Sequence, residues 1–254
     1  MTNFLFLHAH PDDEAIFTGG TIKKLANDGH NVHVVFATGG ELGKKLNSEQ
    51  NILDTRFEES QNACKILNVS SFEFLGYHDS GLDKDDFPEN AFAKCDIDEA
   101  SKKLNFFIES KSIDVFICDD EYGIYGHPDH LQAHLVGVAS SILVKEFYNT
   151  TVDREYLHFV ETHLVEEANI AHASTLDLAR TTLGMSSVEI AHTISVNDAL
   201  AEKRKAMKAH ASQIDDTSSA LILNNDQFRA VYGYEWFIGF NEDSRSNSLL
   251  KYCI

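Results

Sequence analysis

The sequence NFLFLHAHPDDE at residues 3–14 joins an apolar run to a cluster of histidine and carboxylate side chains. The apolar and aromatic residues at 3–7 predict a buried strand, and the polar residues lie where that strand ends. Apolar side chains then recur at helical spacing from Thr21 to a stop signal at Gly29, which predicts a short helix. A second apolar run at 31–37 predicts the next strand, so the chain opens as strand, turn, helix and strand.

This alternation continues through the first half of the chain. Further strands are predicted at 72–75 and 114–118, and further helices at 52–67, at 97–109 and from about 130 to 144. Repeated strand-turn-helix units favour a mostly parallel, right-handed sheet with helices on both faces. We therefore expect an α/β fold, with one Rossmann-like domain over residues 1–254.

The C-terminal part has a less regular pattern. Apolar runs predict strands at 155–164, 189–196 and 232–240. Between the last two, Asn197 and Asp198 are candidate caps for a helix that runs to about His210.

Composition limits the class of protein. Against 40 Asp and Glu, the 254 residues contain only 21 Lys and Arg, a net charge of −19 that argues against nucleic acid or an anionic membrane as a partner. A hydrophobic content of 43% and a mean hydropathy of −0.24 are typical of soluble globular proteins. The opening apolar run is too short for a signal peptide or a membrane span, so we expect a cytoplasmic protein.

Two polar clusters each follow an apolar strand directly, His-Pro-Asp-Asp-Glu at 10–14 and His-Pro-Asp-His at 127–130. In a parallel sheet the carboxyl ends of the strands meet at one edge, so the clusters converge if the strands are neighbours. Histidine with carboxylate and without thiolate suits a catalytic divalent metal, most often Zn²⁺ with three protein ligands and one open position. The candidate ligands are His10, Asp13 and His130.

The residues beside these ligands are candidates for acid–base chemistry. A water activated by a metal must lose a proton, and Asp12 is the candidate general base. Attack on a carbonyl builds negative charge on its oxygen, which a protonated His127 would stabilise. Asp129 is then expected to orient the His127 imidazole or to raise its pKa, or to support a metal ligand.

Other interpretations of the same residues stay open. His134 lies four residues after His130, so a His-x-x-x-His pair is a rival ligand assignment, although Asp13 already completes a set of three. The same ligands would also serve a metal-dependent phosphoesterase or another amidohydrolase. A sugar-binding module with a structural metal is a third interpretation. The sequence pattern assigns no role to His78 or His210.

These motifs resemble the PIG-L or LmbE-like N-acetylglucosaminyl deacetylases. That family's first signature, Ala-His-Pro-Asp-Asp-Glu, is intact at 9–14, and its second, His-Pro-Asp-His, is intact at 127–130. Weaker matches are Thr55-Arg56 with Glu58 and Glu59, Asp79-Ser80-Gly81, and 205–213. The chain departs from the family at His78, where proline is more common.

The resemblance implies a zinc-dependent hydrolase that removes the acetyl group from an N-acetylated amino sugar and releases acetate, with Fe²⁺ as an alternative metal. Carried over by position, it implies three metal ligands, His10, Asp13 and His130. It also implies Asp12 as general base and His127 as the group that stabilises the oxyanion or protonates the amine. Tyr125 and Arg56 would contact the intermediate and the substrate. The expected partner is a small amino-sugar conjugate, with a homo-oligomer as an alternative assembly.

Overall fold

The computed structural model describes residues 1–43, 51–82, 87–160, 162–163, 183–215, 218–240 and 249–253. At its centre is a seven-stranded sheet in the order β3-β2-β1-β4-β5-β7-β6. The strands are β1 (Asn3–His8), β2 (Asn31–Thr38), β3 (Ser71–Tyr77), β4 (Val115–Asp119), β5 (Glu146–Thr151), β6 (His192–Ser195) and β7 (Tyr234–Gly239). The first five strands in this spatial order are parallel, and β7 and β6 extend the sheet in antiparallel pairs.

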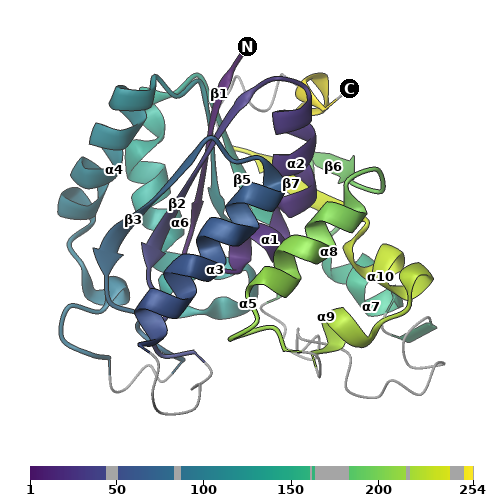
Figure 1. The fold of residues 1–254 in the computed structure, drawn as a ribbon. Helices are drawn as coiled ribbons and strands as arrows, with labels where there is room; N and C mark the ends of the chain where they lie inside the picture. Colours follow the sequence, from purple (N-terminus) through teal and green to yellow (C-terminus); the bar gives the residue numbers. More distant parts are fainter. Residues whose placement is uncertain are drawn as a thin grey trace.

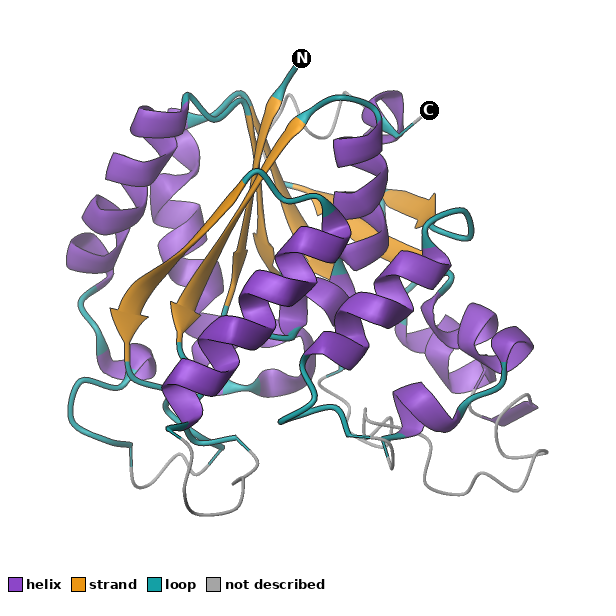
Figure 2. Ribbon diagram, viewed as in Figure 1, coloured by secondary structure: helices purple, strands orange, loops and turns teal. Residues whose placement is uncertain are grey.

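Helices cover both faces of the sheet (Figures 1 and 2). One face carries α4 (Ile97–Lys111) and α6 (Pro128–Ser140), and the other carries α2 (Gly19–Asn27), α3 (Ile52–Leu67) and α8 (Leu200–Ala209). Shorter helices are α1 (Asp13–Phe17), α5 (Gly123–Gly126), α7 (Arg154–Val160), α9 (Ser219–Ile222) and α10 (Asn225–Tyr232). This arrangement confirms the expected α/β fold, while the division into one domain stays a prediction.

The central strand β1 shows why a continuous apolar run belongs inside such a sheet. Phe4 and Phe6 pack into the core beneath α2, α3 and α8, whereas Leu5 and Leu7 pack into the core beneath α4 and α6. Successive side chains of a strand point to opposite faces, so a strand covered on both faces must be apolar throughout.

Two C-terminal predictions were wrong. The predicted strand at 155–164 forms α7 over its described part up to Val160, because Asp153 accepts the Tyr156 N–H at 2.9 Å and starts a helix that buries Leu157. The predicted caps of α8 do not cap it: the helix begins after Ala199 without a side-chain cap. The helix itself and the strands β6 and β7 are confirmed.

The strand that sequence reasoning missed is β5, which pairs with β4. Four of the six residues in its sequence EFYNTT are polar or charged, yet all six are buried. Several of these polar groups have internal partners: the Tyr148 hydroxyl donates to Glu146 at 2.6 Å, and Asn149 donates to the Asp119 carbonyl at 2.9 Å. Among the described helices, none is long and apolar enough to cross a membrane, and the cytoplasmic location stays a prediction.

Candidate metal centre

The two histidine-containing turns follow β1 and β4, which are neighbours at the centre of the sheet. From β1 the chain moves outward to β2 and β3 on one side, and it later returns through β4 and β5 on the other. Strand order therefore reverses between β1 and β4, and such a switch point is where open α/β sheets bind ligands. The expected convergence of the two turns is thus met.

His10, Asp13 and His130 lie together as the sequence predicts. Asp13 Oδ2 lies 3.5 Å from His10 Nδ1 and 3.4 Å from His130 Nε2, and all three residues are buried. Ligand atoms bound at about 2.0–2.2 Å around a tetrahedral ion stand roughly 3.3–3.6 Å apart. Both the donor types and their spacing fit a metal such as zinc.

The outer nitrogens of both imidazoles face carboxylates. His10 Nε2 donates to Asp129 Oδ2 at 3.2 Å, and His130 Nδ1 lies 2.8 Å from Asp119 Oδ2. A carboxylate on the outer nitrogen holds the proton there, which leaves the inner nitrogen free to bind a metal. Burial by itself would raise the pKa of Asp13, but the neighbouring His130 and His10 outweigh burial and lower that pKa, so Asp13 is ionised.

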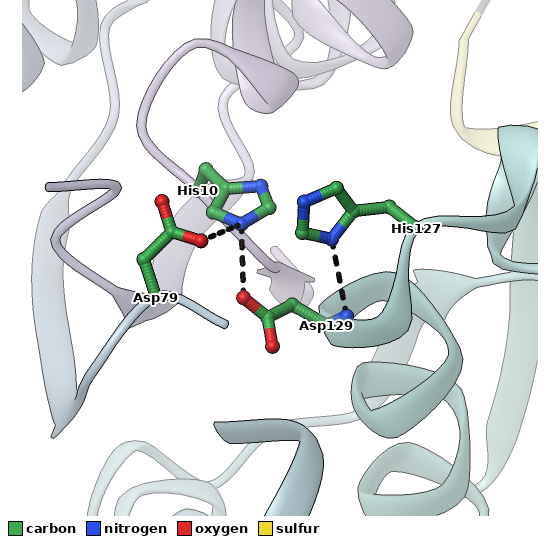
Figure 3. Close-up of side chains that lie close together, drawn as sticks. All are labelled: His10, Asp79, His127 and Asp129. Carbon is green, nitrogen blue, oxygen red and sulfur yellow. Dashed lines mark hydrogen bonds and ion pairs between the residues drawn. The ribbon is translucent and has the colours of Figure 1, made fainter. Parts of the chain in front are cut away.

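A second group of four residues shares His10 (Figure 3). Asp79 and Asp129 both approach the His10 ring, and His127 lies beside it with the ring centroids 4.6 Å apart. These carboxylates already accept other hydrogen bonds, Asp79 from the Gly81 N–H at 2.8 Å and Asp129 from the Ser80 N–H at 2.9 Å. We therefore assign the Asp79 and Asp129 carboxylates to holding His10 in place.

Asp12 differs from its neighbour Asp13 in backbone conformation and in surroundings. Its φ of 106° places it in the left-handed region, and its side chain is 18% exposed. Asp12 Oδ2 lies 3.5 Å from a guanidinium nitrogen of Arg56. Burial raises the pKa of Asp12 to about 6, although Arg56 opposes that rise. The carboxylate lies beside the three-residue group without belonging to it.

Arg56 contacts the protein itself. Its side chain is 3% exposed and donates hydrogen bonds to the carbonyl groups of Pro11 and Gly40. Gly40 has a φ of 64°, and a Cβ atom there would lie 2.3 Å from the guanidinium. Arg56 thus fastens the Gly-rich turn after β2 to the turn that carries Asp12.

His127 is placed differently from the expectation of a protonated imidazole held by Asp129. Its Nδ1 accepts the backbone N–H of Asp129 at 3.1 Å and so caps α6. A nitrogen that accepts a hydrogen bond carries no proton, so the ring proton lies on Nε2. Burial, followed by the charges of His10 and His130, lowers the pKa of His127 to about 3.

Tyr125 reaches the same site from α5. Its hydroxyl lies 3.3 Å from His130 Nε2, the nitrogen that faces Asp13. The preceding Ile124 has a φ of 57°, and the buried Asp120 carboxylate accepts its N–H at 2.9 Å. Asp120 therefore stabilises the loop conformation that presents Tyr125.

His134, His78 and His210 fall outside the ligand group. His134 Nδ1 lies 3.0 Å from the Asp119 carbonyl, which supports the packing role over the rival ligand role. His78 is mostly exposed and pairs with Glu41 at 2.8 Å. His210, fully buried, contacts Glu14 at 2.6 Å.

Sequence reasoning missed Asp119, whose position directly after the apolar residues of β4 was the available signal.

The sequence matches a known protein family and resembles curated members of it. Residues 5–141 match the sequence profile of a family described as PIG-L: GlcNAc-PI de-N-acetylase. A curated relative from Nocardiopsis dassonvillei is named 1D-myo-inositol 2-acetamido-2-deoxy-alpha-D-glucopyranoside deacetylase. It is 31% identical over 263 residues, which cover 92% of this chain and 92% of the relative.

Two solved structures share the fold. N,N'-diacetylchitobiose deacetylase from Pyrococcus horikoshii has a TM-score of 0.61 and 20% identity, covering 94% of this chain and 84% of its own. The zinc inhibited form of teicoplanin deacetylase has a TM-score of 0.59 and 15% identity, covering 95% of this chain and 100% of its own.

Proposed function

The chain belongs to the PIG-L family of GlcNAc-PI de-N-acetylases and is a deacetylase. We propose that it removes acetate from an N-acetylglucosaminyl inositol conjugate. The relative from Nocardiopsis dassonvillei, which is aligned over nearly its whole length, is named for that substrate class. The observation that carries the proposal is the buried set of His10, Asp13 and His130 with the Asp12 carboxylate beside it.

The metal proposed for this set is Zn²⁺, with Fe²⁺ as the alternative. Two imidazoles and one carboxylate match the ligand types of catalytic zinc sites. When bound, the ion supplies a Lewis acid that polarises the acetamide carbonyl and activates water for attack. Asp129 and Asp119 hold the two imidazoles in the orientation that this binding needs.

Asp12 is proposed as the general base. Its carboxylate has Arg56 as a charged neighbour at 3.5 Å and lies next to the ligand Asp13. It takes a proton from the water as the new C–O bond forms at the acetamide carbon. The same carboxyl group then gives the proton to the amine nitrogen as the C–N bond breaks, which releases acetate and the free amine.

His127 and Tyr125 are proposed to stabilise the negative charge that develops on the carbonyl oxygen. Because His127 Nδ1 accepts a backbone N–H, its Nε2–H is available as a neutral donor. The Tyr125 hydroxyl lies 3.3 Å from His130 Nε2, the nitrogen proposed to bind the metal, and offers a second hydrogen-bond donor. Donors held in place before the reaction stabilise an oxyanion most effectively. Arg56 is proposed to act on the substrate indirectly, through the two turns that it fastens together.

A panel of acetylated sugars tests the substrate proposal. The zinc-loaded chain is incubated with N-acetylglucosaminyl inositol, N,N'-diacetylchitobiose or free N-acetylglucosamine, and released acetate is measured. We expect the highest kcat/KM with the inositol conjugate. A preference for diacetylchitobiose contradicts the inositol assignment, and an absence of acetate from all three contradicts the proposed function. A phosphate ester in the same panel tests the phosphoesterase alternative directly.

A further inference from the structure

A buried chain of contacts joins the Asp12 backbone to the C-terminal part of the protein. The Asp12 N–H donates to Glu14 Oε2 at 2.9 Å, and the other carboxylate oxygen, Glu14 Oε1, lies 2.6 Å from His210 Nε2. Both Glu14 and His210 are fully buried. The contact between Glu14 and His210 spans a sequence separation of 196 residues and links His210, through Glu14, to Asp12.

His210 is held firmly at its own end. It follows α8 directly, and its carbonyl accepts the N–H groups of Gln213 at 3.0 Å and Ile214 at 2.8 Å. The preceding helix is anchored by Lys203, which pairs with Glu235 at 2.5 Å with both side chains 1% exposed. The imidazole is therefore a fixed support for Glu14.

Asp12 needs such a support because of its backbone conformation. A φ of 106° is uncommon for a residue with a side chain, and such conformations persist when the surroundings hold them. The Asp12 side chain makes no capping hydrogen bond to α1, so Glu14 is what fixes its N–H. On the other side, Arg56 binds the Pro11 carbonyl. Rotation of this backbone would swing the Asp12 carboxylate away from the substrate.

We infer that His210 is a positioning residue for the deacetylase reaction: it fixes Glu14, which in turn holds Asp12 in the conformation that directs its carboxylate at the attacking water. This inference rests on the proposed function of Asp12 as general base. His210 lies outside both groups of candidate metal ligands, so its effect falls on turnover rather than on metal binding.

Three variants of His210 test the inference. Among the described residues only Nε2 of the ring has a hydrogen-bond partner, and the amide of glutamine places a donor at nearly the same point, whereas that of asparagine falls short. We expect His210→Ala and His210→Asn to lower kcat by about 100-fold, as a small misplacement of a catalytic group does. His210→Gln should recover most of that loss, and KM and bound zinc should stay within about twofold of the parent in all three.

His33→Ala is the matched control, because it removes another buried imidazole. His33 lies near the start of β2 and contacts Ser71 at the start of β3. This variant should keep the parent kcat. The inference is overturned if His210→Gln is as slow as His210→Asn, if His210→Asn is no slower than the control, or if the loss follows a loss of zinc. Should His210→Ala fail to fold, the comparison of the two amide variants decides. A parent enzyme that releases no acetate contradicts the proposed function itself.

Discussion

At the scale of single residues, the site separates two adjacent carboxylates into different roles. Asp13 is the first residue of α1 and turns its side chain to both imidazoles, whereas Asp12 has a left-handed backbone and faces Arg56. Neighbouring residues of one turn thus reach different partners because their backbone angles differ. This separation suits the roles proposed for them, a metal ligand for Asp13 and a general base for Asp12.

Replacing Asp12 with asparagine should uncouple metal binding from turnover. Asp12→Asn keeps the shape of the side chain and removes its capacity to take a proton, so we expect unchanged bound zinc and a kcat lowered by about 10²- to 10⁴-fold. Metal analysis and acetate release are measured on the same preparation. Asp13→Ala serves as the contrast, because it should lose zinc and activity together. Parent turnover in Asp12→Asn would remove Asp12 from the role of base.

Asp119 should influence the metal without touching it. Asp119→Asn weakens the carboxylate that faces His130 Nδ1 at 2.8 Å, and losing such a support typically lowers metal affinity or activity by about 10- to 100-fold. Competition with a chelator of known affinity measures the change in the zinc dissociation constant. Asp114→Asn, which alters a carboxylate just before β4, is the control and should bind zinc like the parent. Equal affinity in both variants would contradict the support role.

The candidate ligands could be proposed from sequence because each belongs to a short histidine and carboxylate motif that follows a recognisable strand. His10 and Asp13 are three residues apart in one turn, and that local spacing is visible in the sequence. Contacts such as that between Glu14 and His210 were not predictable, since nothing local relates residues 196 positions apart. The tautomer of His127 also depended on structure, because a backbone N–H set it.

At the scale of elements, the sequence pattern predicted strands best where helices cover both faces of the sheet. The strands β1, β2 and β4 are apolar on both faces, and their sequences show it directly. The pattern failed for β5, whose polar side chains are buried, and for α7, where a short apolar run did not distinguish a strand from a helix. Tertiary contacts decide the conformation of β5, whereas a local cap at Asp153 starts α7.

The buried pair of Lys203 and Glu235 should be a strong anchor for α8. Glu235 also accepts the N–H groups of Gly20 and Thr21 at 2.8 Å, so one carboxylate ties β7, α8 and the start of α2 together. Removing one partner of a buried ion pair leaves an uncompensated charge, which costs about 3–5 kcal/mol. We therefore expect Lys203→Met to lower the free energy of unfolding by about that amount in urea titrations.

A paired change provides the control for this prediction. Lys203→Met combined with Glu235→Gln removes both charges, so the double variant should be more stable than Lys203→Met alone. A single variant as stable as the parent would contradict the anchoring role.

At the scale of the whole molecule, the chain end returns to the sheet. Lys251 and Tyr252 contact Glu146 of β5 at 2.7 and 2.9 Å, and Tyr252 packs edge-on against Phe4 of β1 with ring centroids 5.0 Å apart. Figure 1 shows both chain ends on the same side of the molecule. The last described residues thus stabilise the central strands.

The contacts of Lys251 and Tyr252 with Glu146 should weaken in acid. Burial raises the pKa of Glu146, but Lys251 and the hydroxyls of Tyr148 and Tyr252 outweigh burial, and the net pKa lies below the ordinary value of 4.5. A lowered folded-state pKa means that the stabilisation is fully present above pH 4.5 and is lost as the pH falls through the folded value.

The comparison of Glu146→Gln with the parent, by thermal unfolding at pH 7 and at progressively lower pH, measures this contribution. The variant should be less stable at pH 7, and the difference should shrink in acid. A difference that grows as the pH falls would contradict the assignment.

The placement of the two turns on β1 and β4 also has a consequence for how the protein reaches its native state. His10 and Asp129 are 119 residues apart in sequence, and β2 and β3 join the sheet from the intervening chain. Bringing such distant segments together is slow, because chain entropy is lost before the contacts form. During synthesis the first turn emerges with two of the three candidate ligands, long before the second turn brings His130. Tight binding of the proposed metal would therefore be a late event, and it would mark the moment when the two halves of the sheet have joined.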